Sequence, residues 1–94
     1  MTEKVWLYPG EMGNWHFVTL TKKYGQEIKE HFGKNRRGFG SIPVEVVISK
    51  TTWKTSIFPD KRAGSYLLPL KAAVRKKEDI EVGDVVTFTI NVCL

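Results

Sequence analysis

The feature that most constrains the fold of this chain is the alternation of apolar and polar residues along positions 86–92. Every second residue of this stretch is apolar, and the residues between them are threonine or asparagine. Because successive side chains of a strand point to opposite faces, this period of two predicts a strand over residues 85–92 with one buried face. Residues 43–49 follow the same period, which places Val44, Val46 and Ile48 together.

Four shorter segments are also expected to be strands. They are rich in aromatic, β-branched and other large apolar residues, and turn-forming residues such as Pro, Gly and Asp lie between them. These segments are residues 4–8, 15–20, 53–58 and 65–68, and the main turns are residues 9–13, 59–64 and 80–84. The Pro59-Asp60 pair is expected to end the strand before it.

One longer segment has a helical period instead. Tyr24, Ile28 and Phe32 recur at every fourth position, which places them on one face of a helix. Thr21 is expected to cap the start of this helix and Gly33 to mark its end. A glycine inside the first turn weakens the prediction there, because glycine is a poor helix former.

A second, short helix is expected to open at Pro69. Proline presets the backbone angle that a first helical residue needs. Leu70 and Val74 are four positions apart and are expected to face the core.

Six strands with two short helices predict a mainly β domain, either a small barrel or a sandwich. The sequence has no internal repeat and no linker-like segment, so we expect one domain over residues 1–94. A domain of this size buries a small core and has little room for a deep catalytic cavity. Pairing with a second copy, as a homodimer, would bury more surface.

Charge and cysteine content narrow the class of protein. The chain has 15 Lys and Arg residues against 10 Asp and Glu residues, for a net charge of +5. This excess suits an anionic partner, and it equally suits a soluble protein that keeps its net charge away from zero. The single cysteine, Cys93, excludes an internal disulfide. No signal peptide or membrane-length apolar run is recognisable, so we expect a cytoplasmic protein with no membrane attachment.

A recognisable pattern fills the last third of the chain: Leu68-Pro69, then Val74-Arg75, then residues 80–86. It resembles the AbrB-type transition-regulator domain, in which a strand reaches a proline, a short helix holds an arginine, and an Ile-x-x-Gly-Asp turn opens the next strand. Two extra residues between Pro69 and Arg75 depart from that pattern. The DNA-contacting residues of that family therefore cannot be transferred to this chain.

Longer motifs in the same order extend over nearly the whole chain. They are residues 15–18, 40–46, 53–60, 66–71, 73–76 and 82–84. Together they resemble the family called domain of unknown function 1905. The resemblance implies a bacterial or archaeal protein with a double-split β-barrel. It implies no settled activity and offers no functional residues to carry over, and some relatives have a second domain after this one.

Basic side chains form the first candidate site, a surface for nucleic acid or another anion. The candidates are Lys54, Lys61, Arg62, Lys71 and Arg75, with Arg36 and Arg37 in a separate glycine-rich loop. Cations neutralise phosphates, and aromatic side chains stack on unpaired bases. The alternative is an ordinary solvated surface, in which Arg75 offsets a helix dipole or pairs with Glu78.

The strand and loop over residues 53–64 form the second candidate, a site for a small ligand or a protein partner. Hydroxyl groups, one carboxylate and two cations of this segment could surround a small anion, and loops on a rigid barrel often carry function. The alternative is a structural turn in which Ser56 and Asp60 bond to the backbone and Phe58 fills the core.

Catalytic and metal chemistry find little support in the sequence. His16, His31 and Cys93 are far apart and have no metal-ligand spacing. The sequence contains no phosphate-loop motif and no recognisable pairing of a nucleophile with a base. We therefore expect no enzyme, no metal and no cofactor. Trp6, Trp15 and Trp53 are interpreted as core or interface residues.

The sequence thus favours a non-catalytic binding module, with nucleic acid as the first candidate partner. The competing hypothesis is a small-ligand or protein-interaction module that uses residues 53–64. The two differ in one measurable property, because phosphate contacts make binding steeply salt-dependent and an apolar pocket does not.

Overall fold

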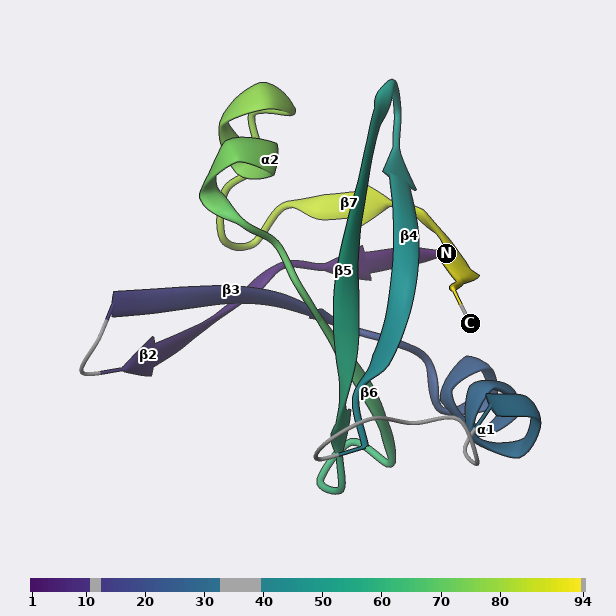
Figure 1. Ribbon diagram of the computed structural model, residues 1–94. Coiled ribbons are helices and arrows are strands. Elements are labelled where there is room, and N and C mark those ends of the chain that lie inside the picture. Colours follow the sequence, from purple (N-terminus) through teal and green to yellow (C-terminus); the bar gives the residue numbers. More distant parts are fainter. Residues whose placement is uncertain (11–12, 33–39, 94) are drawn as a thin grey trace.

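The computed structural model describes residues 1–10, 13–32 and 40–93, and these contain eight strands and two helices (Figure 1). The strands are β1 (Thr2–Lys4), β2 (Trp6–Gly10), β3 (Gly13–Thr19), β4 (Ile42–Ile48), β5 (Thr51–Asp60), β6 (Ser65–Pro69), β7 (Val85–Thr87) and β8 (Thr89–Val92). The helices are α1 (Lys22–Phe32) and α2 (Ala72–Lys77). The predicted mainly β class is confirmed.

The strands form two antiparallel sheets. The larger sheet has the order β2-β3-β6-β5-β4-β8, and the smaller sheet pairs β1 with β7. In Figure 1, β4 and β5 stand upright as a long hairpin, and the β2–β3 hairpin crosses behind and extends to the left. The six-stranded sheet is not closed on itself, so its strand order alone does not make a barrel.

Eight strands replace the predicted six because two of the predicted strands change partner midway. The break between β1 and β2 is Val5, and the break between β7 and β8 is Phe88; each is only 1% exposed. Val5 donates its N–H to Asp84 O at 2.8 Å and accepts the N–H of Gly83 at 2.9 Å. Phe88 donates to Met1 O at 2.7 Å. The alternation of residues 86–92 continues through this break, so the sequence period does not reveal it.

The start of α1 agrees with the sequence prediction. The N–H of Tyr24 donates to Thr21 Oγ1 at 3.2 Å, which is the expected cap. Ile28 is buried and Tyr24 is half-buried, so the predicted apolar face of this helix packs inward. The predicted stop at Gly33 lies outside the described residues.

The start of α2 differs from the prediction. Pro69 does not open the helix but is the last residue of β6, where it lies opposite Phe17. The helix begins at Ala72, after one extended residue at Lys71. Leu70 and Val74 are buried as predicted.

The prediction that Pro59-Asp60 ends a strand is also wrong, because β5 continues through Asp60. Proline lacks an N–H and is tolerated in a sheet only where one side of the strand is unpaired. The pairing of β4 with β5 ends at Ile57, so Pro59 has a partner strand only on the β6 side, opposite Tyr66. The proline therefore costs the sheet no hydrogen bond to β4.

The buried side chains form one cluster that draws on both sheets and both helices. Strand β4 contributes every second residue, as its alternation predicted, and Val86, Phe88 and Ile90 are also buried. Trp53 is 7% exposed and belongs to this core. The prediction that one face of these strands is buried is confirmed.

Gly25 allows α1 to approach β6 more closely than any other residue would. A Cβ atom at this position would lie 2.1 Å from Ser65 Oγ and 2.9 Å from Ser65 Cα. The Ser65 hydroxyl donates to Thr21 O at 3.0 Å across the same contact. The glycine that weakens the helix prediction is thus a requirement of the packing.

We expect the substitution Gly25→Ala to destabilise the protein. Alanine favours a helix by about 1 kcal/mol over glycine, but the added methyl group meets the Ser65 backbone, and overpacking of this kind costs about 1–3 kcal/mol. Urea unfolding measures the free energy change. The control Lys23→Ala changes an exposed residue of the same helix and is expected to stay within about 0.5 kcal/mol. A Gly25→Ala protein as stable as the wild type would contradict the close contact.

Candidate functional site

Aromatic side chains gather on one face of four adjacent strands, β2, β3, β6 and β5. Residues opposite each other in antiparallel strands share a face. The register pairs Trp6 with Phe17 and Tyr8 with Trp15, and it pairs Phe58 with Leu67. We call this surface the aromatic face; its residues are Trp6, Tyr8, Trp15, Phe17, Phe58 and Leu67.

The rings of the aromatic face pack against one another while staying accessible to solvent. The Trp15 and Phe17 rings are nearly parallel, with centroids 6.3 Å apart, and the Trp6 ring lies 5.2 Å from that of Phe17. Trp6 is held in place because its indole N–H donates to Thr19 Oγ1 at 2.9 Å. Tyr8 and Trp15 are nevertheless 56% and 54% exposed.

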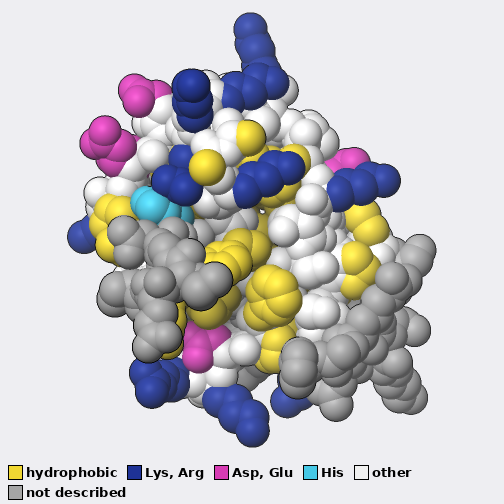
Figure 2. Space-filling view, turned by 60° about the vertical axis from the view of Figure 1, so that its left-hand side comes forward, with side chains coloured by type: hydrophobic (Ala, Val, Ile, Leu, Met, Phe, Trp, Pro, Cys, Tyr) yellow, Lys and Arg dark blue, Asp and Glu magenta, His cyan; other side chains and the backbone are white. Residues whose placement is uncertain are grey.

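A hollow of about 370 Å³ lies in the aromatic face, and Tyr8, Trp15, Phe17, Phe58 and Leu67 line it. Figure 2 shows hydrophobic side chains gathered at the centre of this side of the molecule, with Lys and Arg side chains above and below them. Soluble proteins rarely expose clustered large apolar side chains without a use for them. The hollow is therefore the most distinctive surface feature of the described chain.

Four of the predicted basic residues lie at the two ends of β6. Lys61 and Arg62 belong to the exposed turn that precedes β6, whereas Lys71 and Arg75 follow it, before and within α2. The five residues of β6 span about 17 Å. The cations thus lie beyond the two ends of β6 and do not form one continuous patch.

Arg75 has a structural role that the sequence did not predict. Its Nε donates to Leu70 O at 3.0 Å, and its Nη1 lies 3.4 Å from His16 Nε2. The expected pairing with Glu78 is wrong, because Glu78 instead accepts a hydrogen bond from the hydroxyl of Thr51. Arg75 joins α2 to β3 and is the least exposed of the five predicted cations that the structure describes.

Lys54 is exposed on the surface of β5, and Glu45 of β4 lies directly opposite it in the register. Opposite charges in such cross-strand positions attract each other. The charge of Lys54 is therefore partly offset by its neighbour. Arg36 and Arg37, the remaining predicted cations, lie outside the described residues.

The predicted loop site over residues 53–64 is only partly as expected. Asp60 accepts the N–H of Arg62 at 3.1 Å through its carboxylate, which confirms its predicted bond to the backbone. Phe58 does not fill the core, since it is 43% exposed and lines the hollow of the aromatic face. The strand β5 thus contributes to a surface site at Phe58, a position that the sequence interpretation assigned to the interior.

Trp15, interpreted from the sequence as a core or interface residue, does not lie in the core, since it is 54% exposed. The sequence analysis did not predict the aromatic face. The signal was present in the sequence, because Trp6 and Tyr8 alternate along one strand and Trp15 and Phe17 along the next. If the two strands form a hairpin, the Trp6–Tyr8 pair and the Trp15–Phe17 pair can lie on the same face of it. Which face was buried could not be decided from these two strands alone.

Comparison with known protein families now adds one finding. A family model described as domain of unknown function (DUF1905) matches residues 2–90. The chain belongs to the DUF1905 family. No curated protein and no solved structure gives a significant match to the chain.

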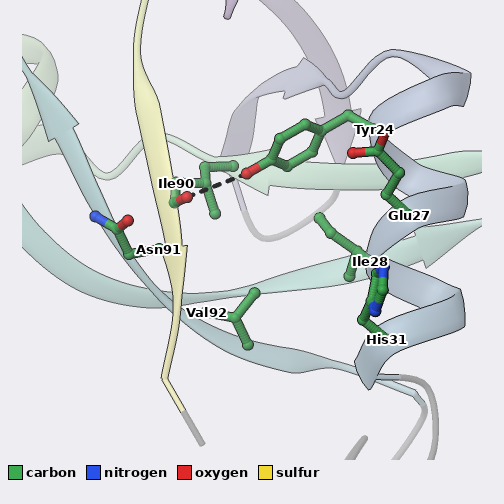
Figure 3. Close-up of a pocket in the computed structure, with 7 residues that line it drawn as sticks. All are labelled: Tyr24, Glu27, Ile28, His31, Ile90, Asn91 and Val92. Carbon is green, nitrogen blue, oxygen red and sulfur yellow. Dashed lines mark hydrogen bonds between the residues drawn. The ribbon is translucent and has the colours of Figure 1, made fainter.

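A second hollow of this DUF1905 chain lies between α1 and β8 and measures about 340 Å³ (Figure 3). Tyr24 and Ile28 of the helix point toward the strand, and the Tyr24 hydroxyl donates to Ile90 O at 3.1 Å. Burial, and then the negative charge of Glu27, raise the pKa of the Tyr24 phenol above its ordinary value of 10.0. This groove joins the helix to the end strand of the sheet.

No group of three or more His, Cys, Asp or Glu side chains within residues 1–10, 13–32 and 40–93 is placed to hold a metal ion. Neither helix in these ranges has the length and apolar character needed to cross a bilayer.

The raised pKa of the half-buried Tyr24 phenol predicts a loss of stability at alkaline pH. Because the pKa of Tyr24 is raised in the folded state, folded protein holds this proton more tightly than unfolded protein. The contribution to stability is complete below the ordinary pKa and is lost as the pH rises through the folded pKa. Urea unfolding at neutral and alkaline pH should show a smaller alkaline loss in Tyr24→Phe than in wild type. Tyr8→Phe serves as the control, and an equal loss in all three proteins would contradict the prediction.

Proposed function

We propose that this DUF1905 domain binds single-stranded nucleic acid across the aromatic face. The observation that carries the proposal is the exposed hollow formed by Tyr8, Trp15, Phe17, Phe58 and Leu67, with cations at both ends of β6. Unpaired bases stack on aromatic side chains, and cations along the path neutralise the backbone.

The form of the face favours a single strand over a duplex. A base can stack on Trp15 or Phe58 only when it is not already stacked and paired within a double helix. The carbon-rich lining offers few groups for hydrogen bonds to base edges, so it supports binding with little sequence preference. Lys61 and Arg62 at one end, and Lys71 at the other, would follow the phosphates as the strand crosses β6.

The same lining supports a binding role rather than a catalytic one. No carboxylate, imidazole or thiol is among the five described residues that line the hollow. Among the side chains that serve in general acid–base catalysis, the lining contains only the Tyr8 phenol. We therefore propose a non-catalytic module.

We also infer that the two sheets together make the double-split barrel that the family resemblance implies. Strands β1 and β2 are separated by Val5 alone, and β7 and β8 by Phe88 alone. The β1–β7 pair therefore connects the two end strands of the larger sheet, β2 and β8. This connection supports a barrel in which two strands are each divided between the two sheets, one at Val5 and the other at Phe88.

Loss of one ring should weaken binding of a single strand without changing its salt dependence. Stacking on one side chain is worth about 1–3 kcal/mol, so we expect Trp15→Ala or Phe58→Ala to reduce affinity roughly 5- to 150-fold. Fluorescence anisotropy of a short labelled single strand measures this affinity at several salt concentrations. Val85→Ala is the matched control, because Val85 is 66% exposed and is not part of the aromatic face.

Removal of a cation at an end of β6 should, by contrast, change the salt dependence of binding. Replacing Lys61 or Arg62 with alanine should lower the slope of log affinity against log salt by about 0.7 for each phosphate that the side chain neutralises in the wild type. No binding of single strands by the wild type at low salt would overturn the proposal. So would ring variants that bind like wild type but change the sedimentation of the protein, since the face would then serve contacts between copies.

A further inference from the structure

A third hollow, of about 520 Å³, lies between α1 and the turn that joins β5 to β6. Its lining comes from three separate parts of the chain: Gly25, Gln26 and Lys29; Gly40; and Pro59, Asp60, Lys61, Gly64, Ser65 and Tyr66. None of these residues lines the hollow of the aromatic face. A volume of this size falls within the range typical of small-molecule sites.

Three glycines belong to the lining of this hollow. Gly40 and Gly64 have φ values of 90° and 64°, in the left-handed region that other residues resist. Gly25 brings α1 against Ser65, and the Ser65 hydroxyl ties the two walls together through its bond to Thr21 O at 3.0 Å. The hollow therefore has backbone walls that a ligand can approach closely.

The charges around the hollow are mainly positive. Lys29 of α1 and Lys61 of the turn both line it, although they are far apart in the sequence. Lys22 extends over the same turn, with its Cε 3.8 Å from the position that a Cβ on Gly64 would take. Asp60, the only carboxylate among the described lining residues, already accepts the N–H of Arg62 at 3.1 Å. Concave sites with one sign of charge concentrate ligands of the opposite sign.

We propose that this hollow binds a phosphate-bearing small molecule about the size of a mononucleotide. The ammonium groups of Lys29 and Lys61 would hold the phosphate, since lysine is a common phosphate ligand and acts there as a point charge. The amide of Gln26 and the ring of Pro59 would contact the remainder of the ligand. This site shares Lys61 with the proposed path of the single strand, but none of its lining residues lines the hollow of the aromatic face.

The test uses inorganic phosphate, a nucleoside monophosphate and the corresponding nucleoside as probes of the whole chain in solution. The backbone amides of Gly25, Gly40 and Gly64 report from the lining in a proton–nitrogen NMR spectrum. We expect both phosphate-bearing probes to cause saturable shifts of these amides, with tighter binding of the nucleoside monophosphate. The nucleoside alone should cause no saturable shift.

Charge-removing variants locate the phosphate. Lys29→Gln and Lys61→Gln should each weaken phosphate binding roughly tenfold, the loss expected for one charged hydrogen bond. Lys54→Gln removes an exposed lysine that does not line the hollow, and it should bind like wild type. The NMR spectrum of each variant also shows whether its fold is retained.

Two results would overturn the proposal: no saturable shift of the three glycine amides, or equal effects of the Lys54 and Lys29 variants. The variant Trp15→Ala separates this site from the aromatic face. It should lose affinity for a single strand and keep its affinity for phosphate. Loss of phosphate binding in Trp15→Ala would show that the two surfaces are one site and would refute the independent hollow.

Discussion

The arrangement of this protein depends on the backbone hydrogen bonds that Val5 and Phe88 make where their strands change partner. Each residue continues a strand in sequence but leaves one sheet for the other, bonding to Asp84 and Gly83 in one case and to Met1 in the other. Both side chains are fully buried, so the change of partner takes place inside the core. The small β1–β7 sheet is thereby fixed to both ends of the larger sheet, and the positions of β2 and β8 follow from it.

The larger sheet uses its two faces differently. One face supplies the buried cluster that includes Ile57 and Leu68, whereas the other carries exposed rings on β2, β3 and β5. Rings such as Trp15 gain little from the hydrophobic effect while they stay in water. Their mutual packing, with Phe17 between Trp6 and Trp15, keeps them ordered and ready to meet flat partners without a further loss of side-chain freedom.

The sequence predicted the strands and helices well, because period-two and period-four patterns report directly on burial. It placed all six predicted strands within or over observed strands, and it located the Thr21 cap and the buried Leu70 and Val74. It missed the breaks at Val5 and Phe88, because alternation does not change when a strand exchanges partners. It misplaced Phe58, because a strand's own pattern cannot say which face the rest of the chain covers.

The candidate site was predicted less completely than the fold. The cations could be named from charge alone, but their separation to the two ends of β6 is a property of topology. Arg75 looked like a surface cation, and only its bonds to Leu70 and His16 reveal that it connects elements. Gly25 looked like a helix defect, although the close contact with Ser65 requires it.

The bond between Tyr24 and Ile90 has a consequence for the behaviour of the protein at high concentration. Strand β8 ends the six-stranded sheet, and an uncovered end strand is a template on which strands of other molecules can assemble. The Tyr24 hydroxyl occupies an outward-facing carbonyl of β8, and the side chains of α1 lie along the same side of the strand (Figure 3). The helix thus covers part of the edge that β8 would otherwise present to other molecules, and the Tyr24 phenol occupies one backbone acceptor of this edge.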